Sequence, residues 1–366
     1  MRIGIDGRAF VGKVTGVGRY ISELCKILAR ILPSAEFFIY CNKPIEIPCE
    51  LNSWNLRIDN RRFSRGIKPV LWLKSRCGTL TRQDRLDLFW GGASFLPELQ
   101  ASVESILTVH DLTYIEAPKS MSLFHRLSFV TFLKADVLKA TWLTVNSVGT
   151  KERLSLVTGR TADEVIFPAA NSIFTRASST QIDTVLQKYK INEPYFLAAS
   201  TWEPRKNLEL LIRAFLELKL KGKVNREKLV LVGGHGWKDV RLSVLAKSDE
   251  SIIPLGYICD SELAALYSGT LAFVYPSVYE GFGIPLLEAR SCGAKIITTD
   301  IPELHESGGD DATYIRPTQD ALVVAMSSHL SDSRAFAPTP HSCHFHGMPT
   351  WSEGGETLAS LMSRQS

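Results

Sequence analysis

Short apolar runs of strand type alternate with longer helical patterns along the chain, and this alternation occurs twice. In the first half the expected strands are residues 2–6, 36–41, 86–90, 105–110 and 142–146. In the second half they are residues 195–200, 228–234, 252–256, 271–277, 294–299 and 312–317. Strands that alternate with helices indicate βαβ units, whose strands form a parallel sheet. The sequence therefore predicts an α/β protein with two similar lobes.

The chain length supports this division, because 366 residues exceed the roughly 100 to 200 residues of a typical domain. Residues 168–180 lack periodicity and indicate a linker. We expect an N-terminal Rossmann-like domain over residues 1–170 and a C-terminal one over residues 171–335. Residues 336–366 are expected to form a loop and a helix, with a return to the N-terminal domain as one option. Ligands should bind in the cleft outside the carboxyl ends of the strands.

The composition is typical of a globular protein, with 45% hydrophobic and 22% charged residues. No stretch reaches about 18 uninterrupted apolar residues, and the chain opens with a strand pattern instead of a charged and then apolar leader. We therefore expect a cytoplasmic protein. No nucleic-acid partner is expected.

One segment is strongly basic. Residues 57–85 contain nine Lys and Arg residues and two Asp residues, whereas the whole chain carries a net charge of only +4. Apolar residues, among them Trp72 and Leu73, lie between these charges. The segment is therefore expected either to contact an anionic membrane or a phosphate-bearing acceptor, with Trp72 and Leu73 inserting shallowly, or to be a solvated amphipathic face.

The most informative motif covers residues 277–293, SVYEGFGIPLLEARSCG. Glu280 follows an expected buried strand, and Gly281 and Gly283 allow a ligand to approach the backbone closely. Pro285 suits the first turn of a helix, whose unpaired N–H groups attract a diphosphate. The motif therefore predicts a strand, an anion-binding loop and a helix N-terminus.

Glu280 and Glu288 are eight residues apart, so two carboxylates can approach one ligand. Sugar and ribose hydroxyls are suitable partners, because a diphosphate would repel a carboxylate. The alternative is that Glu280 caps the helix and Glu288 is a solvated acid on its first turn.

This motif resembles the E-x7-E signature of the retaining glycosyltransferases of family 4, which have the GT-B fold of two Rossmann-like domains facing each other across a cleft. The matching residues are Pro276, Ser277, Glu280, Gly281, Phe282, Gly283, Pro285, Glu288, Ala289 and Gly293. The resemblance implies that Glu280 is a catalytic residue that orients sugar hydroxyls. It also implies that the donor is bound by Gly281, Phe282, Gly283, Ile284 and Glu288.

The segment TWEPRKNLELLIRAF, residues 201–215, is similar to another element of that family. The resemblance implies that Arg205 and Lys206 hold the donor diphosphate. Many relatives also have an Arg where this chain has Ser200 and Thr201, so Arg205 would have to make a second phosphate contact. The alternative for Arg205 and Lys206 is an exposed pair at a helix start.

Two elements of the first half also resemble the family, VHDLTY at 109–114 and TGVGRY at 15–20. They imply that the N-terminal domain is the acceptor side, that His110 faces the donor sugar and acts in catalysis, and that Gly16 borders the donor diphosphate or the acceptor. The alternative is that His110 is only structural, as a single His at a strand end often is.

The resemblance implies transfer of a sugar, with GDP-mannose as the first donor to consider, to a glycan or a polyprenyl-diphosphate-linked acceptor in polysaccharide synthesis. No cofactor and no metal are expected, since no Asp-x-Asp occurs. Peripheral contact with an anionic inner membrane face is expected. A sugar-nucleotide epimerase of the same fold and a non-catalytic carbohydrate-binding protein stay open. A nicotinamide dehydrogenase is disfavoured, because no Gly-x-Gly-x-x-Gly follows Asp6.

Residues 334–349 depart from the family pattern and are rich in Pro and His. His341, His344 and His346 raise the weak hypothesis of a metal site, whereas a surface loop is the better interpretation. The residues after this stretch predict a final helix that begins at Thr350 or Ser352.

Overall fold

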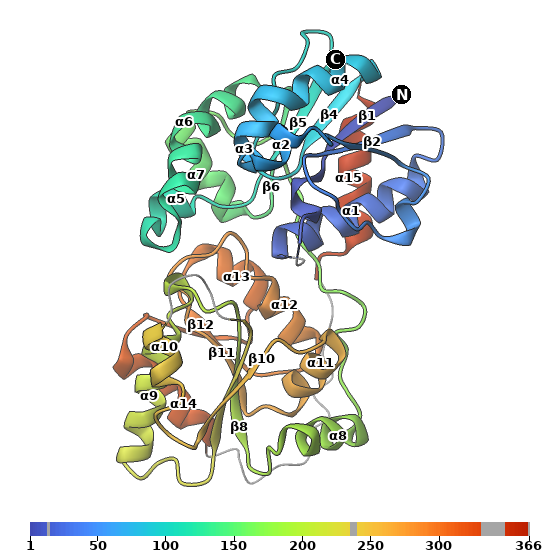
Figure 1. The fold of residues 1–366 in the computed structure, drawn as a ribbon. Helices are drawn as coiled ribbons and strands as arrows, with labels where there is room; N and C mark the ends of the chain where they lie inside the picture. Colours follow the sequence, from blue (N-terminus) through green and yellow to red (C-terminus); the bar gives the residue numbers. More distant parts are fainter. Residues whose placement is uncertain (13–14, 235–239, 331–347, 365–366) are drawn as a thin grey trace. The chain divides into compact units, whose positions relative to one another are not determined.

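A computed structural model describes residues 1–12, 15–234, 240–330 and 348–364 (Figure 1). The chain divides into two compact units. Unit 1 comprises Met1–Ile115, Met121–Pro168 and Pro349–Ser366, and unit 2 comprises Glu116–Ser120 and Ala169–Met348. The hypothetical metal site at His341, His344 and His346 lies outside the described residues.

Unit 1 contains a seven-stranded parallel sheet of order β3-β2-β1-β4-β5-β6-β7. The strands are β1 (Arg2–Asp6), β2 (Glu36–Cys41), β3 (Asn55–Ile58), β4 (Leu88–Gly91), β5 (Glu104–Val109), β6 (Trp142–Val145) and β7 (Glu164–Val165). The strand order reverses between β1 and β4. In a doubly wound sheet this reversal opens a crevice at the carboxyl ends of the two strands.

Helices connect these strands. They are α1 (Gly16–Ile31), α2 (Arg62–Gly66), α3 (Pro69–Trp72), α4 (Gly78–Asp84), α5 (Thr113–Glu116), α6 (Leu123–Lys139) and α7 (Val148–Thr158). Shorter turns are η1 (Gly7–Phe10), η2 (Cys49–Leu51), η3 (Leu73–Cys77) and η4 (Pro118–Ser120), of which η4 belongs to unit 2.

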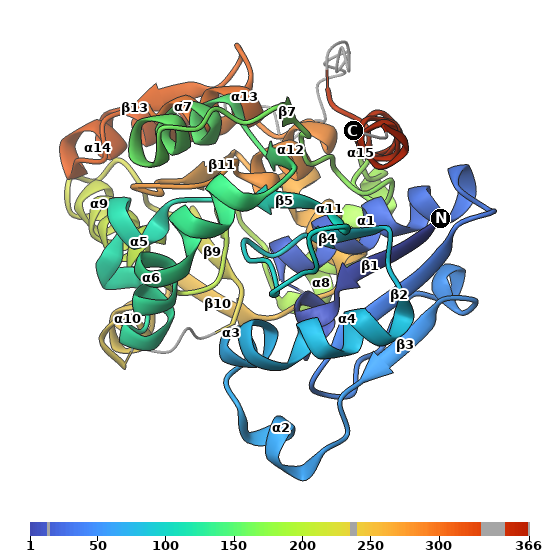
Figure 2. The ribbon, with the colours of Figure 1, turned by 90° about the horizontal axis from the view of Figure 1, so that it is seen from above.

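The last helix, α15 (Trp351–Ser363), belongs to unit 1 and lies beside α1 in Figures 1 and 2. Thr350 caps it, as one of the two predicted starts, in a capping box with Glu353. Gly355 is needed where the helices meet, because a Cβ there would lie 2.3 Å from Ile27 Cγ2. Leu358 and Leu361 join the core that Ile21 and Leu24 form over the sheet.

The basic segment is partly neutralised inside unit 1. Arg57 pairs with Asp84 at 2.9 Å, Arg76 lies 3.7 Å from Asp59, and Lys74 pairs with Asp136. The prediction that Trp72 and Leu73 insert into a membrane is wrong, since both side chains are fully buried. Trp72 is also held in place, because its Nε1 donates to Asp59 at 3.1 Å.

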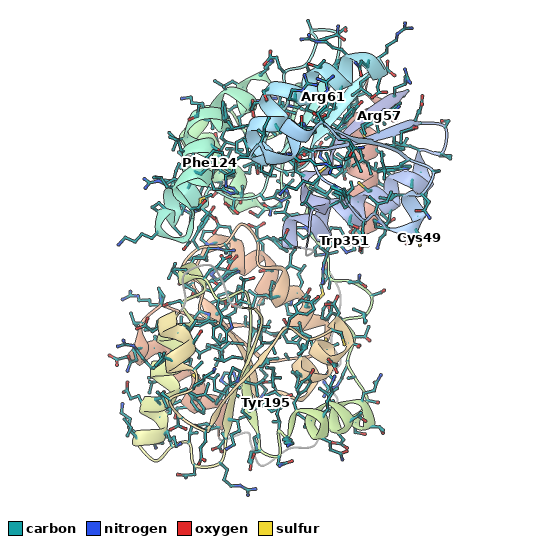
Figure 3. All side chains as sticks on the ribbon, viewed as in Figure 1. Cys49, Arg57, Arg61, Phe124, Tyr195 and Trp351 are labelled. Carbon is teal, nitrogen blue, oxygen red and sulfur yellow. The ribbon has the colours of Figure 1, made fainter. Side chains whose placement is uncertain are left out.

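Unit 2 contains a six-stranded parallel sheet of order β10-β9-β8-β11-β12-β13. The strands are β8 (Tyr195–Ala199), β9 (Lys228–Val232), β10 (Ile252–Gly256), β11 (Ala272–Tyr275), β12 (Ile296–Thr299) and β13 (Thr313–Ile315). Tyr195, labelled in Figure 3, is fully buried, and its hydroxyl donates to Leu266 O. The strand order reverses between β8 and β11.

Helices cover both faces of this sheet, so its strands are continuous apolar runs. The helices are α8 (Ser179–Tyr189), α9 (Leu208–Leu220), α10 (Val240–Leu245), α11 (Asp260–Gly269), α12 (Ile284–Ser291), α13 (Pro302–Gly308) and α14 (Gln319–Leu330). Apolar residues of α9, α10 and α14 pack on one face, and those of α8, α11, α12 and α13 pack on the other. Within the described ranges, no helix is both long and apolar enough to span a bilayer.

Candidate active site

Two loops meet where the strand order of unit 2 reverses. The first leaves β8 and contains the turn η5 (Pro204–Lys206), and the second, residues 276–283, joins β11 to α12. The backbone N–H of Val278 donates to Arg205 O at 2.9 Å, which ties the loops together. This end of a doubly wound sheet is where ligands bind.

A buried cluster of charges occupies this junction. Lys206 Nζ donates to Glu280 Oε1 and to the Tyr275 hydroxyl, both at 2.6 Å. Arg205 Nη1 donates to Glu280 Oε2 at 2.5 Å, and Arg205 Nε donates to Glu203 at 3.2 Å. Glu280 is only 6% exposed and Lys206 only 8%. One carboxylate therefore bridges two cations from the neighbouring loop.

The surroundings shift the proton affinities of this cluster. Burial alone would raise the pKa of Glu280, but the charges of Arg205 and Lys206 lower it to about 2. Burial and the nearby Arg205 charge lower the pKa of Lys206 to about 8, against the opposing effect of Glu280. Near neutral pH Glu280 is an anion and Lys206 is mostly an ammonium.

The loop ends in a helix start suited to an anion. Gly283 has φ of 97°, and a Cβ there would lie 2.6 Å from Leu304 Cδ2, so glycine is required. Gly283 is also the N-cap of α12 and makes no side-chain cap bond. The alternative interpretation of Glu280 as the helix cap is therefore wrong. Pro285 lies in the first turn, as predicted.

The other predicted donor-binding residues lie on the same loop and helix. Phe282 is 3% exposed, and its carbonyl accepts a hydrogen bond from the Ser307 hydroxyl at 2.7 Å. Gly281 and Ile284 are partly exposed. Glu288 is 6% exposed within α12, so the alternative of a solvated acid is wrong.

Comparisons with known proteins agree with this arrangement. Residues 193–332, which contain the charged cluster, match the family described as glycosyl transferases group 1. The chain is 30% identical over 342 residues to O-antigen chain mannosyltransferase B of Escherichia coli, and the match covers 87% of each protein. The chain belongs to the group 1 glycosyl transferases.

Solved structures of glycosyltransferases have the same fold as this chain. Sucrose-phosphate synthase of Thermosynechococcus elongatus has a TM-score of 0.74 at 19% identity, over 99% of this chain and 98% of that one. HepE of Anabaena in complex with UDP-glucose has a TM-score of 0.72 at 14% identity, over 99% of each chain. The predicted GT-B class with two Rossmann-like domains is confirmed. The chain belongs to a family of glycosyltransferases and not of epimerases, and it is an enzyme, so neither a sugar-nucleotide epimerase nor a non-catalytic binding protein fits it any longer.

Two of the predicted site residues, His110 and Gly16, lie in unit 1. His110 follows β5, is 6% exposed, and its Nε2 lies 2.7 Å from Gly92 O. Burial lowers the pKa of His110, and its Nε2–H donates to that carbonyl, because a carbonyl oxygen can only accept. Gly16 is the first residue of α1, whose N-cap is Thr15. Among the described residues, no group of three His, Cys, Asp or Glu could hold a metal ion.

Two members of the cluster, Tyr275 and Glu203, were not predicted from the sequence. Tyr275 ends β11, and its hydroxyl donates to Glu280 Oε1 at 3.0 Å while accepting from Lys206. Glu203 pairs with Arg205. The only signal for Tyr275 was a hydroxyl-bearing residue at the carboxyl end of an apolar strand, which a core tyrosine would also give.

The alternative of an exposed helix-start pair fails for Lys206, which is buried, whereas Arg205 is half-buried. Both residues precede α9, which begins at Leu208 after Asn207 in the left-handed conformation. The geometry thus brings Arg205, Lys206 and Glu280 into contact at the end of β8 and β11.

Proposed function

We propose that this enzyme is a retaining mannosyltransferase that uses GDP-mannose and elongates a lipid-linked or glycan acceptor in surface-polysaccharide synthesis. The observation that carries the proposal is the cluster of Arg205, Lys206 and Glu280 in a chain similar to an O-antigen chain mannosyltransferase. Lys206 has three N–H donors, of which Glu280 and Tyr275 use two. The remaining donor is available for a phosphate oxygen.

The cluster would act mainly through electrostatics. Arg205, Lys206 and the start of α12 stabilise the negative charge that develops on the departing diphosphate. The bond from the anomeric carbon to the phosphate oxygen breaks, and a bond to the acceptor oxygen forms on the same face. The acceptor hydroxyl gives its proton to the departing phosphate oxygen. Glu280, released from part of its contact with the two cations, accepts hydrogen bonds from sugar hydroxyls and orients the sugar.

The remaining site residues have roles in the same proposal. Gly281, Gly283 and Ile284 present backbone to the diphosphate, and Phe282 shapes the loop. Glu288 approaches the nucleotide ribose or the sugar. His110 contacts the donor sugar through its ring or its backbone, and Gly16 borders the diphosphate or the acceptor.

Labelled donors test this proposal directly. We expect the enzyme to transfer mannose from GDP-[14C]mannose to a lipid-linked saccharide and not glucose from UDP-[14C]glucose. Nuclear magnetic resonance of the product should show an α-linkage, the configuration of the donor. Transfer from UDP-glucose alone would overturn the donor assignment, and a β-linked product would overturn retention.

We further propose that the acceptor is a polyprenyl-diphosphate-linked saccharide and that unit 1 contacts an anionic membrane surface to reach it. Arg61, Arg65, Lys68, Arg82 and Arg85 of the basic segment are exposed. Each basic side chain near such a surface contributes about 1 kcal/mol, screened beyond a Debye length of roughly 8 Å at physiological salt. Replacing Arg61, Arg65 and Lys68 by Ser should weaken vesicle binding without changing nucleotide affinity.

A further inference from the structure

Helix α6 exposes a row of large apolar side chains. Leu123 is 80% exposed, Leu127 and Val130 are each 59% exposed, and Leu138 is 55% exposed. At 3.6 residues per turn these four residues lie on one side of the helix, together with Phe124 at its edge. Soluble proteins rarely leave such a contiguous stripe uncovered, and it commonly marks an interaction surface.

Two basic side chains of α6 lie in or beside this stripe. Lys134 lies within it and Arg126 beside it, and both are exposed. The only carboxylate in the sequence of α6 is Asp136, which is buried, pairs with Lys74 and accepts from Leu96 N. The exposed face of α6 is therefore apolar and cationic and carries no acidic group.

The stripe continues into the basic segment. Lys68 Nζ lies 5.7 Å from the centre of the ring of Phe124, at the edge of the stripe. Leu71, three residues after Lys68 in the sequence, is 41% exposed. Figure 3 labels Phe124 on α6 and Arg61 on the basic segment, both in unit 1. The contact between Lys68 and Phe124 thus joins the apolar stripe to the positive charge of the basic segment.

We propose that α6 lies in the interface of an anionic bilayer, with Leu123, Phe124, Leu127 and Val130 among the acyl chains. This inference rests on the proposed membrane-linked acceptor and names the element that enters the membrane. Lys68, Arg126 and Lys134 then contact lipid phosphates, because an amphipathic helix in an interface combines buried apolar area with cations at headgroup level. The charge pattern favours this occupant over a protein groove, since Lys68, Arg126 and Lys134, which lie in or beside the stripe, are all positive.

Vesicle flotation tests the proposal with a matched pair of variants. The stripe variant carries Leu123→Ser, Leu127→Ser and Val130→Ser. The control variant carries Leu156→Ser, Leu220→Ser and Val324→Ser, residues that are 88%, 88% and 69% exposed on α7, α9 and α14. Both remove two leucines and one valine from exposed positions. The rise in melting temperature that GDP causes is measured for both variants and reports whether each variant is folded.

We expect the wild type and the control to bind vesicles containing phosphatidylglycerol, and the stripe variant to bind at least tenfold more weakly. Wild-type binding should weaken with added salt. Equal flotation of a folded stripe variant and the wild type would overturn the role of α6. If the Arg61, Arg65 and Lys68 variant still weakened binding in that case, the membrane proposal itself would stand. A different result would overturn the proposal: the wild type does not bind vesicles but self-associates, and the stripe variant does not self-associate. The stripe would then be an interface with a second copy of the chain.

Discussion

The two units place a buried cation at the same topological position but hold it differently. In unit 1, Arg8 follows β1 and makes a bidentate pair with Asp6, whose carboxylate is fully buried at the strand end. In unit 2, Lys206 follows β8 and is held by Glu280 from the loop after β11. Among the residues that the structure describes, Asp6 pairs with one cation, whereas Glu280 is shared by two.

We propose that this difference separates a structural pair from an exchangeable one. Asp6 is only two residues from Arg8 and contacts it within one loop. Glu280 lies on a separate loop that contains Gly281 and Gly283, and in our proposal its departure would leave two cations for a diphosphate. Arg8 also donates to Ala93 O at 3.1 Å, and this bond joins the segments that follow β1 and β4. In unit 2, the bond from Val278 N to Arg205 O joins the segments that follow β8 and β11 in the same way.

The largest expected effect is on stability in unit 1. Replacing Arg8 with Met leaves the buried Asp6 without its cation, which should cost about 3–5 kcal/mol of unfolding free energy. Denaturation in urea measures this loss, and the double variant with Asp6→Asn should recover much of it. Nucleotide affinity of the folded protein should not change. If the Arg8 variant were as stable as the wild type but bound nucleotide more weakly, the pair in unit 1 would be part of a nucleotide site and not a structural pair.

The next effect is on catalysis in unit 2. Glu280→Ala and Lys206→Ala should each lower transfer by at least ~2 kcal/mol in barrier height, on the order of 30-fold in rate. Both variants should stay folded, because Tyr275 still contacts Lys206 in the first, and Arg205 and Tyr275 still contact Glu280 in the second. Steady-state rates of the purified variants check this, and turnover near that of the wild type would remove these residues from the site.

A smaller effect is expected from pH. The ammonium form of Lys206 attracts a diphosphate, so GDP affinity should fall above pH 8 by at most about tenfold per pH unit. Between pH 8 and the ordinary value of 10.5, the unfolded chain binds more protons at this residue, so Lys206 contributes stability that rises with pH. Lys206→Arg should remove both trends, because a guanidinium stays charged. Equal pH slopes of GDP binding in Lys206→Arg and wild type would assign the titration to another group.

The smallest expected effect is that of a chelator. No Asp-x-Asp occurs in the sequence, and Arg205 and Lys206 can supply the positive charge that a metal would otherwise supply. Transfer rates should therefore be the same with and without EDTA. Activity that EDTA removes and that Mn²⁺ or Mg²⁺ restores would contradict this expectation.

The sequence predicted most of the fold because eleven strands are apolar runs between helical patterns. It missed β3 and β7, which are short edge strands with largely half-exposed residues. Their sequences lack the apolar signal because only part of each side chain is buried. The cap at Thr350 was predictable from local spacing, since a capping box needs only residues three apart.

Contacts between residues far apart in the sequence could not be predicted. The partner of Lys74 is Asp136, 62 residues away and outside residues 57–85, so the local charge count overstated the free cations of the basic segment. Trp72 was predicted to insert into a membrane, because the sequence does not show that its indole N–H donates to Asp59 and that its side chain is buried. In the same way, only the fold brings Lys206 and Glu280, 74 residues apart, into contact.

The most direct test of the account is calorimetric titration of GDP and GMP into the wild type and into Arg205→Ala and Lys206→Ala. GDP and GMP share the base and ribose, so their difference isolates the second phosphate. We expect the wild type to bind GDP at least tenfold more tightly than GMP, about 1.4 kcal/mol, and each variant to lose most of this preference. An undiminished preference for GDP in both variants would contradict the assignment of Arg205 and Lys206 to the donor diphosphate.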